Sequence, residues 1–214
     1  MAKNIAKRSS RKYIEQRMLD EKKKKYDAAN RRLRIFPLIS LALVALTLVF
    51  MLVDWAAVNN SQSGIEVRVT GFNCVAAGLT GNYTSTASVF GDIAVPFNYY
   101  AASYLRPLAA LSVAVMFVVI AHILVEIFAS ITNKQGAFHI LSIVFCAVQF
   151  ALFIACYAAA LAMKDSEILP GYCNGNPACS IISQAILPAL FSLFALASPI
   201  FGIVMSRRVK KLLD

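Results

Sequence analysis

Residues 107–131 read PLAALSVAVMFVVIAHILVEIFASI, a run in which only His122 and Glu126 carry ionisable side chains. Three further runs are almost free of charge, at residues 35–53, 135–163 and 168–206. A helix needs about 20 apolar residues to cross about 30 Å of hydrocarbon, and each run is long enough. The chain is 59% hydrophobic and 15% charged, against about 45–50% apolar in soluble domains. These runs predict an integral membrane protein with four spanning helices.

The runs divide the chain into spans and connections. The predicted fold is an all-α membrane protein, a four-transmembrane-helix bundle, with spans at residues 35–57, 104–131, 137–163 and 180–205. The predicted connections and tails are residues 1–34, 58–103, 132–136, 164–179 and 206–214. Pro188 is expected to kink the fourth span, and Pro199 to bend its end.

The connection between the first two spans predicts a small β-rich unit. Residues Ile65 to Thr70 alternate apolar and polar side chains, which is typical of a half-buried strand. Thr84 to Phe90 is rich in Thr, Ser and Val and predicts a second strand. The glycines between them indicate turns. Trp55 is expected at the membrane surface, as an interfacial anchor at the outer end of the first span.

Basic residues predict the orientation. Residues 1–34 hold thirteen Lys and Arg against four Asp and Glu, and the C-terminal tail is also basic. Because Lys and Arg near span ends favour the cytoplasmic side, both termini are expected in the cytoplasm of a cell-membrane protein. Basic side chains that can meet anionic lipid headgroups are Lys22, Lys23, Lys24, Lys25, Arg31, Arg32, Arg34, Arg207, Arg208, Lys210 and Lys211.

Small residues at helical spacing indicate close helix packing. In lipid, such residues let helix backbones approach each other. The third span carries Ala147, Ala151, Ala155 and Ala159, and the fourth carries Ser198 and Gly202. Packing inside the bundle is the expected use of these faces, and a partner subunit is the alternative.

Three of the five cysteines lie in the predicted outer loops, where disulfides persist. Cys173 and Cys179 flank a short, turn-rich segment and are expected to pair. Cys74 paired with either of them is the alternative. The chain contains no Cys-x-x-Cys pair, which is the motif that would indicate redox catalysis.

Few polar side chains lie inside the spans. His122 and Glu126 are four residues apart and share one helix face, while His139 and Gln149 lie on the next span. The expected role is a polar cluster that holds helices two and three together. A proton or cation relay is the alternative, since intramembrane ionisable groups often mark transport paths. No metal site, cofactor motif or catalytic signature is recognised.

The layout is similar to that of claudin-type tetraspan proteins, with four spans, a β-rich first outer loop, Trp55 and Cys74. The claudin first loop carries Trp-x-x-Cys and a second cysteine. Here Gly71, Phe72 and Asn73 precede Cys74, and no second cysteine follows in that loop, so membership is not inferred.

The sequence therefore predicts a non-catalytic tetraspan protein, an accessory or scaffold subunit of a membrane complex such as a transporter. It would bind the lipid bilayer and other integral membrane proteins, or itself, through its outer loop and small-residue faces, and not nucleic acid. The alternative is a small solute or proton-coupled transporter that uses His122 and Glu126.

Overall fold

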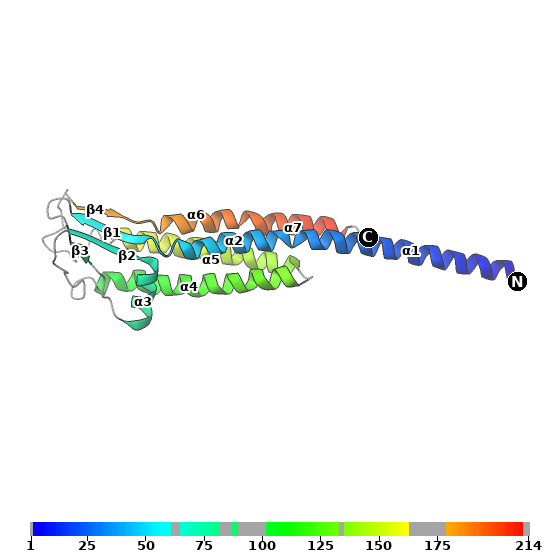
Figure 1. Cartoon of the computed structure of the whole chain (residues 1–214), viewed down its shortest axis with the longest axis horizontal. Coiled ribbons are helices and arrows are strands. Elements are labelled where there is room, and N and C mark those ends of the chain that lie inside the picture. The colour runs from blue at the N-terminus through cyan, green and yellow to red at the C-terminus, as the bar shows by residue number, and fades with distance from the viewer. Residues whose placement is uncertain are drawn as a thin grey trace.

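The computed structural model describes residues 2–60, 65–81, 87–89, 102–132, 135–162 and 179–211. The protein is a bundle of long helices with a small antiparallel sheet at one end (Figure 1). The C-terminal helix ends at the opposite end of the bundle, beyond which the N-terminal helix projects (Figure 1). Both ends of the chain therefore lie away from the sheet.

The predicted four-helix membrane architecture is confirmed. Within the described residues, four helical stretches are long and apolar enough to cross a membrane: Tyr13–Val49, Arg106–Ile131, Gly136–Ala162 and Ile186–Lys210. The helices that contain them are α1 (Ala2–Leu33), α2 (Ile35–Val49), α4 (Ala102–Ile131), α5 (Gln135–Ala162), α6 (Ile186–Ala195) and α7 (Ala197–Lys210). The chain is a multi-pass membrane protein.

The distribution of side chains also suits a lipid environment. Large apolar side chains such as Phe117, Phe128 and Leu193 are exposed on the outside of the bundle. Polar side chains such as Ser40, Ser112 and Gln149 are buried inside it. This pattern is the reverse of that in a water-soluble bundle, and it is favourable only where the surroundings are apolar.

The first span is shorter than predicted. Helix α2 ends at Val49, and strand β1 (Asp54–Asn60) begins within the range 35–57 that was assigned to the helix. Trp55 is not an interfacial anchor, because its side chain is fully buried. Its Nε1 donates a hydrogen bond of 3.0 Å to the carbonyl of Phe50, and its ring packs edge-on against Phe153 of α5.

Among the described residues, the sheet has four strands in the order β3-β2-β1-β4. The predicted strand from Ile65 to Thr70 is confirmed as β2, and β3 (Ala87–Val89) lies within the second predicted stretch. Strand β4 (Cys179–Ile182) was not predicted as a strand; it pairs with β1 and so links the segment before α6 to the segment after α2. The β1–β2 register shifts between Asp54 and Ala56, a bulge that allows Trp55 to turn into the bundle.

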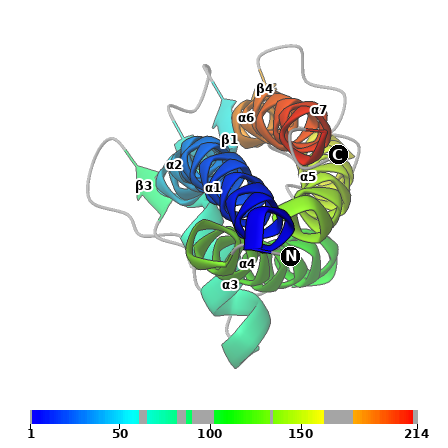
Figure 2. The same cartoon turned by 90° about the vertical axis from the view of Figure 1, so that its right-hand side faces the viewer.

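A short helix, α3 (Gly71–Thr80), occupies a segment in which the glycines predicted turns. The Thr70 hydroxyl caps it by accepting a hydrogen bond of 3.2 Å from the amide of Asn73. Gly81 ends it with a φ of 70°, a conformation that glycine adopts at little cost. The helix packs outside the four spans, against α4 (Figure 2).

The fourth span is divided at Leu196 into α6 and α7, and the predicted kink at Pro188 is not found there. Pro188 lies in the first turn of α6, where a missing N–H is harmless. The break falls at Leu196, three residues before Pro199. Because Pro199 cannot donate to the carbonyl of Ala195, the helix loses one internal hydrogen bond at this point.

Buried residues recur at alternating spacings of three and four residues along α4 and α5. In α5 these are His139, Ser142, Cys146, Gln149, Phe153, Cys156 and Ala160. In α4 they are Leu108, Ser112, Val115, Val119, His122, Glu126 and Ala129. This spacing is typical of helices that pack with a slight left-handed twist, as in most four-helix bundles.

The predicted alanine packing face of α5 is only partly inside. Ala147 and Ala151 are exposed, and Ala155 and Ala159 are half-buried. A strict four-residue repeat drifts around a helix of 3.6 residues per turn, so it cannot follow the bundle seam throughout. Ser198 and Gly202 of α7 are buried as expected.

Candidate functional site

Glu126 lies at the centre of a buried polar network that joins three spans. Its Oε1 accepts a hydrogen bond of 2.7 Å from the Ser40 hydroxyl of α2 and another from the Ser142 hydroxyl of α5. The Nε2 atom of His122, one turn earlier on α4, lies 3.1 Å from the same oxygen. All four side chains are at most 1% exposed. Three polar hydrogens can therefore converge on one carboxylate oxygen.

The network continues from His122 toward the sheet end of the bundle. The Nδ1 atom of His122 lies 3.3 Å from the side-chain oxygen of Gln149, which is fully buried on α5. Phe145 stacks on the imidazole with the ring centroids 5.5 Å apart. The ring is thus held by polar partners at both nitrogens and by an aromatic face.

The Nε2 atom of His122 has two polar neighbours, because it lies 3.1 Å from Glu126 Oε1 and 3.1 Å from the Ser142 hydroxyl. The Gln149 amide nitrogen has no hydrogen-bond partner among the described residues.

His139 is buried close to this network, but no hydrogen bond joins its side chain to the network among the described residues. Its side chain is 1% exposed, and its Nε2 atom has no hydrogen-bond partner in the described structure. The ring lies against Gly202 of α7: a Cβ there would come within 2.6 Å of Nε2. An unpaired buried nitrogen costs about 1–3 kcal/mol, so His139 is a local weak point of the core.

The structure brings together His122, Glu126 and Gln149 of the sequence-predicted cluster, and it places His139 beside them. It adds Ser40 and Ser142, of which Ser40 had no signal beyond being one hydroxyl in an apolar span. Eight of the predicted surface cations are exposed: Lys22, Lys23, Lys24, Lys25, Arg207, Arg208, Lys210 and Lys211. Arg34 is half-buried, and Arg31 and Arg32 are exposed.

Three cysteines whose side chains the structure describes are free thiols. Cys74, Cys146 and Cys156 are all buried and unpaired. The alternative pairing of Cys74 with a cysteine of the second loop is therefore not present. The expected Cys173–Cys179 pair lies outside the residues whose side chains the structure describes.

The network can hold a charge and can bind three helices together. A buried carboxylate is tolerated only with hydrogen-bond donors or an opposite charge beside it, and Glu126 has both types of partner at hand. No group of three or more His, Cys, Asp or Glu side chains that could hold a metal ion is present among the described residues. The geometry supports a structural polar core, and its titratable pair also permits proton binding.

Comparisons of the chain with protein-family models and with curated proteins find no match.

Proposed function

We propose that this protein is a non-catalytic subunit of a membrane complex, an accessory or scaffold component that binds other integral membrane proteins. The observation that supports the proposal is that the buried polar side chains around Glu126 are hydrogen-bonded to one another. Glu126, His122, Ser40 and Ser142 satisfy one another at no more than 1% exposure, so the polar groups are used within the bundle. Contacts to other molecules then fall to the outer surfaces.

One such surface is the alanine face of α5. Ala147 and Ala151 are exposed and lie one turn apart, so a second helix can approach the α5 backbone closely here. Val144 and Val148 are exposed beside them. Packing of a partner helix is favoured over lipid alone because small residues allow close backbone contact.

A second surface is the outer sheet. Strand β4 forms one edge of the four strands, and its Ile182 side chain is 61% exposed. An edge strand offers unpaired backbone groups to an added strand, and an exposed apolar side chain adds contact area. Because β4 pairs with β1, both outer loops present this surface as one unit.

Partner binding is tested by co-purification after gentle solubilisation. The double variant Ala147→Leu/Ala151→Leu places two bulky side chains on the α5 face and should reduce partner recovery. Ala42→Leu/Ala45→Leu on α2 is the matched control, since these alanines are exposed as well. Equal recovery from both variants would count against the α5 face, and a chain that purifies without any partner would contradict the proposal.

The proposal includes an orientation, with both termini in the cytoplasm and the sheet outside the cell membrane. The basic tails support it. Single cysteines at Ser61 and Asn174, in a cysteine-free chain, should react with an impermeant thiol reagent added to intact cells. Cysteines at Ser9 and Lys211 should react only after permeabilisation, and labelling of Ser9 from outside would reverse the arrangement.

A proton-coupled transporter is the second candidate, and the His122–Glu126 contact favours it. A titratable pair within a span is costly and is common on proton paths. The substitution that separates the two functions is Glu126→Gln.

A further inference from the structure

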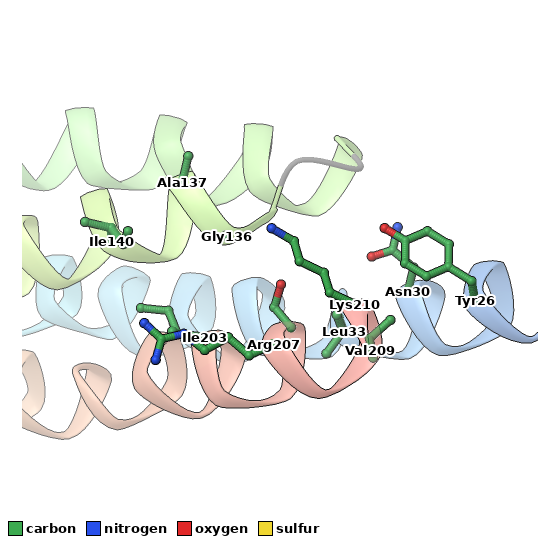
Figure 3. A pocket seen from close by; sticks show the side chains of 11 residues that line it. Tyr26, Asn30, Leu33, Gly136, Ala137, Ile140, Ile203, Arg207, Val209 and Lys210 are labelled. Atoms are coloured by element: carbon green, nitrogen blue, oxygen red, sulfur yellow. The ribbon is translucent and has the colours of Figure 1, made fainter. Parts of the chain in front are cut away.

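A cavity of about 580 Å³ lies between helices α1, α5 and α7, at the end of the bundle away from the sheet (Figure 3). It separates Tyr26 and Asn30 of α1 from Gly136 and Ile140 of α5, with α7 along one side. The space exists partly because residue 136 is glycine: a Cβ there would meet nothing closer than the Ser206 hydroxyl at 3.8 Å. The volume is within the range of about 300–1,000 Å³ typical of small-ligand sites.

The cavity wall has an apolar part and a basic part. Leu33, Ile140 and Ile203 provide the apolar part. Arg207 and Lys210 provide the charge, and Lys210 extends toward Gly136 across the opening (Figure 3). None of the described lining residues is acidic, and neither basic side chain has a salt bridge among the described residues. The cavity is therefore an amphipathic, positively charged site.

The basic residues belong to the end of α7, where Lys210 extends toward Gly136 and the Arg207 side chain runs back along the helix to Ile203 (Figure 3). Ile140 and Ile203 belong to the apolar spans Gly136–Ala162 and Ile186–Lys210, while Arg207 and Lys210 stand in the last turn of α7. Ile140 is 60% exposed, and Val144, one turn deeper, is exposed as well. An apolar track thus leads from the basic end of the cavity along the outside of α5.

We propose that this cavity binds one anionic phospholipid. Lys210 and Arg207 hold its phosphate, the hydroxyl of Ser206 and the polar side chains of α1 face its headgroup and glycerol, and an acyl chain follows Ile140 and Val144. Charge complementarity supports this occupant, because the described lining holds two cations and no acidic residue, a combination that favours an anion. The apolar track distinguishes a lipid from a soluble phosphate, which would leave Ile140 and Ile203 unused. The site does not depend on the proposed partner binding.

The test uses the full chain reconstituted in vesicles of phosphatidylcholine, with or without phosphatidylglycerol, then extracted into mild detergent for native mass spectrometry. The wild-type chain should retain one phosphatidylglycerol. Arg207→Gln/Lys210→Gln should bind it about 30-fold more weakly, the loss expected for two cations near an anionic group. Arg208→Gln/Lys211→Gln removes the same charge from exposed positions outside the cavity and should retain the lipid.

A second variant keeps every charge and fills the space. Gly136→Leu lies at the start of α5, where leucine is a better helix former than glycine, and it should also lose the lipid. Retention by Gly136→Leu, or equal loss from the two charge variants, would overturn the proposal in favour of diffuse attraction to the surface. Displacement of the lipid by inorganic phosphate alone would likewise overturn it, because the site would then recognise only the anion.

Discussion

Gly202 of α7 lies directly against the imidazole ring of His139 on α5, with no room for a side chain. A Cβ at residue 202 would come within 2.6 Å of both Cε1 and Nε2 of this ring. Gly202→Ala should therefore force α5 and α7 apart or displace His139, and lower the free energy of unfolding by about 1–3 kcal/mol. Thermal unfolding in detergent measures the loss.

The ring itself provides the control for this prediction. If the clash is with His139, the double variant Gly202→Ala/His139→Ala should recover part of the stability lost by Gly202→Ala, since directly contacting sites are not additive. Gly136→Ala should be neutral or slightly stabilising, because its new methyl group meets nothing closer than 3.8 Å. Additive losses from the residue 202 and 139 changes would mean that the two residues do not conflict.

Gly71 and Trp55 form a similar contact at the base of the outer sheet. A Cβ at residue 71 would lie 2.5 Å from Cε2 of the buried indole. Gly71→Ala should cost about 1–3 kcal/mol of stability. Because Trp55 is the single tryptophan of the chain, its fluorescence should also shift toward longer wavelength as water gains access.

Gly81→Ala is the matched control for the Gly71 prediction. Its positive φ of 70° makes alanine unfavourable by about 1–2 kcal/mol, but nothing lies within 4 Å of the added Cβ. It should destabilise α3 without changing the tryptophan emission. An unchanged emission in Gly71→Ala would contradict the contact.

Cys74 should be unreactive toward thiol reagents in the folded protein, whereas Cys173 and Cys179 should be oxidised to a disulfide. Burial raises the pKa of the Cys74 thiol to about 12. Its labelling in the native protein should stay low between about pH 8 and pH 10, where an exposed thiol becomes reactive. Above pH 9 the Cys74 thiol loses its proton in the unfolded chain but keeps it in the folded chain. The contribution of the Cys74 thiol to the free energy of unfolding is therefore complete below pH 9 and is lost as the pH rises toward 12.

Peptide mapping without reductant tests the second group. A cross-linked peptide that joins Cys173 to Cys179 is expected. Since Cys74 is buried as a free thiol, it should appear only in the unlinked fraction. A linked peptide that contains Cys74 would show that the two outer loops are joined covalently as well as through β1 and β4.

Hydropathy was enough to find the spans, because each span must contain enough apolar residues to cross the membrane, and this requirement can be read from its own sequence. It could not place Trp55, since an interfacial and a buried tryptophan look alike when the strand that follows the helix is not recognised. It also missed α3, because Gly71 and Gly81 favour turns as much as helix ends, and the capping role of Thr70 depends on the backbone around it. These features are set by tertiary contacts.

The polar network also has one part that the sequence predicts and another that depends on how the helices pack. The four-residue spacing predicted that His122 and Glu126 share a face, and this is a property of one helix. The partner Ser40 is 86 residues away from Glu126, and only the arrangement of α2 beside α4 brings it close. The three- and four-residue spacing of buried positions was present in the sequence. In apolar spans this spacing does not distinguish the buried face of a helix from its lipid-facing face, because both faces are hydrophobic.

Glu126→Gln separates a structural network from a proton path. Gln keeps the shape of the side chain, and its oxygen can still accept hydrogen bonds from Ser40 and Ser142. Its loss of charge weakens the contact with His122. If the network only holds α2, α4 and α5 together, the variant should fold, bind its partners and lose about 0.6–2 kcal/mol, the range for one interhelical polar contact.

The control is Glu126→Leu, which removes the acceptor and leaves Ser40 and Ser142 to find other partners. It should lose more stability than Glu126→Gln, because buried hydroxyls without partners cost about 1–3 kcal/mol each. Detergent thermal stability, partner co-purification and cellular activity are measured together for both variants. A Glu126→Gln protein that is stable and partner-bound but inactive would contradict the scaffold function, because only the titrating group has been removed. We expect that protein to remain active.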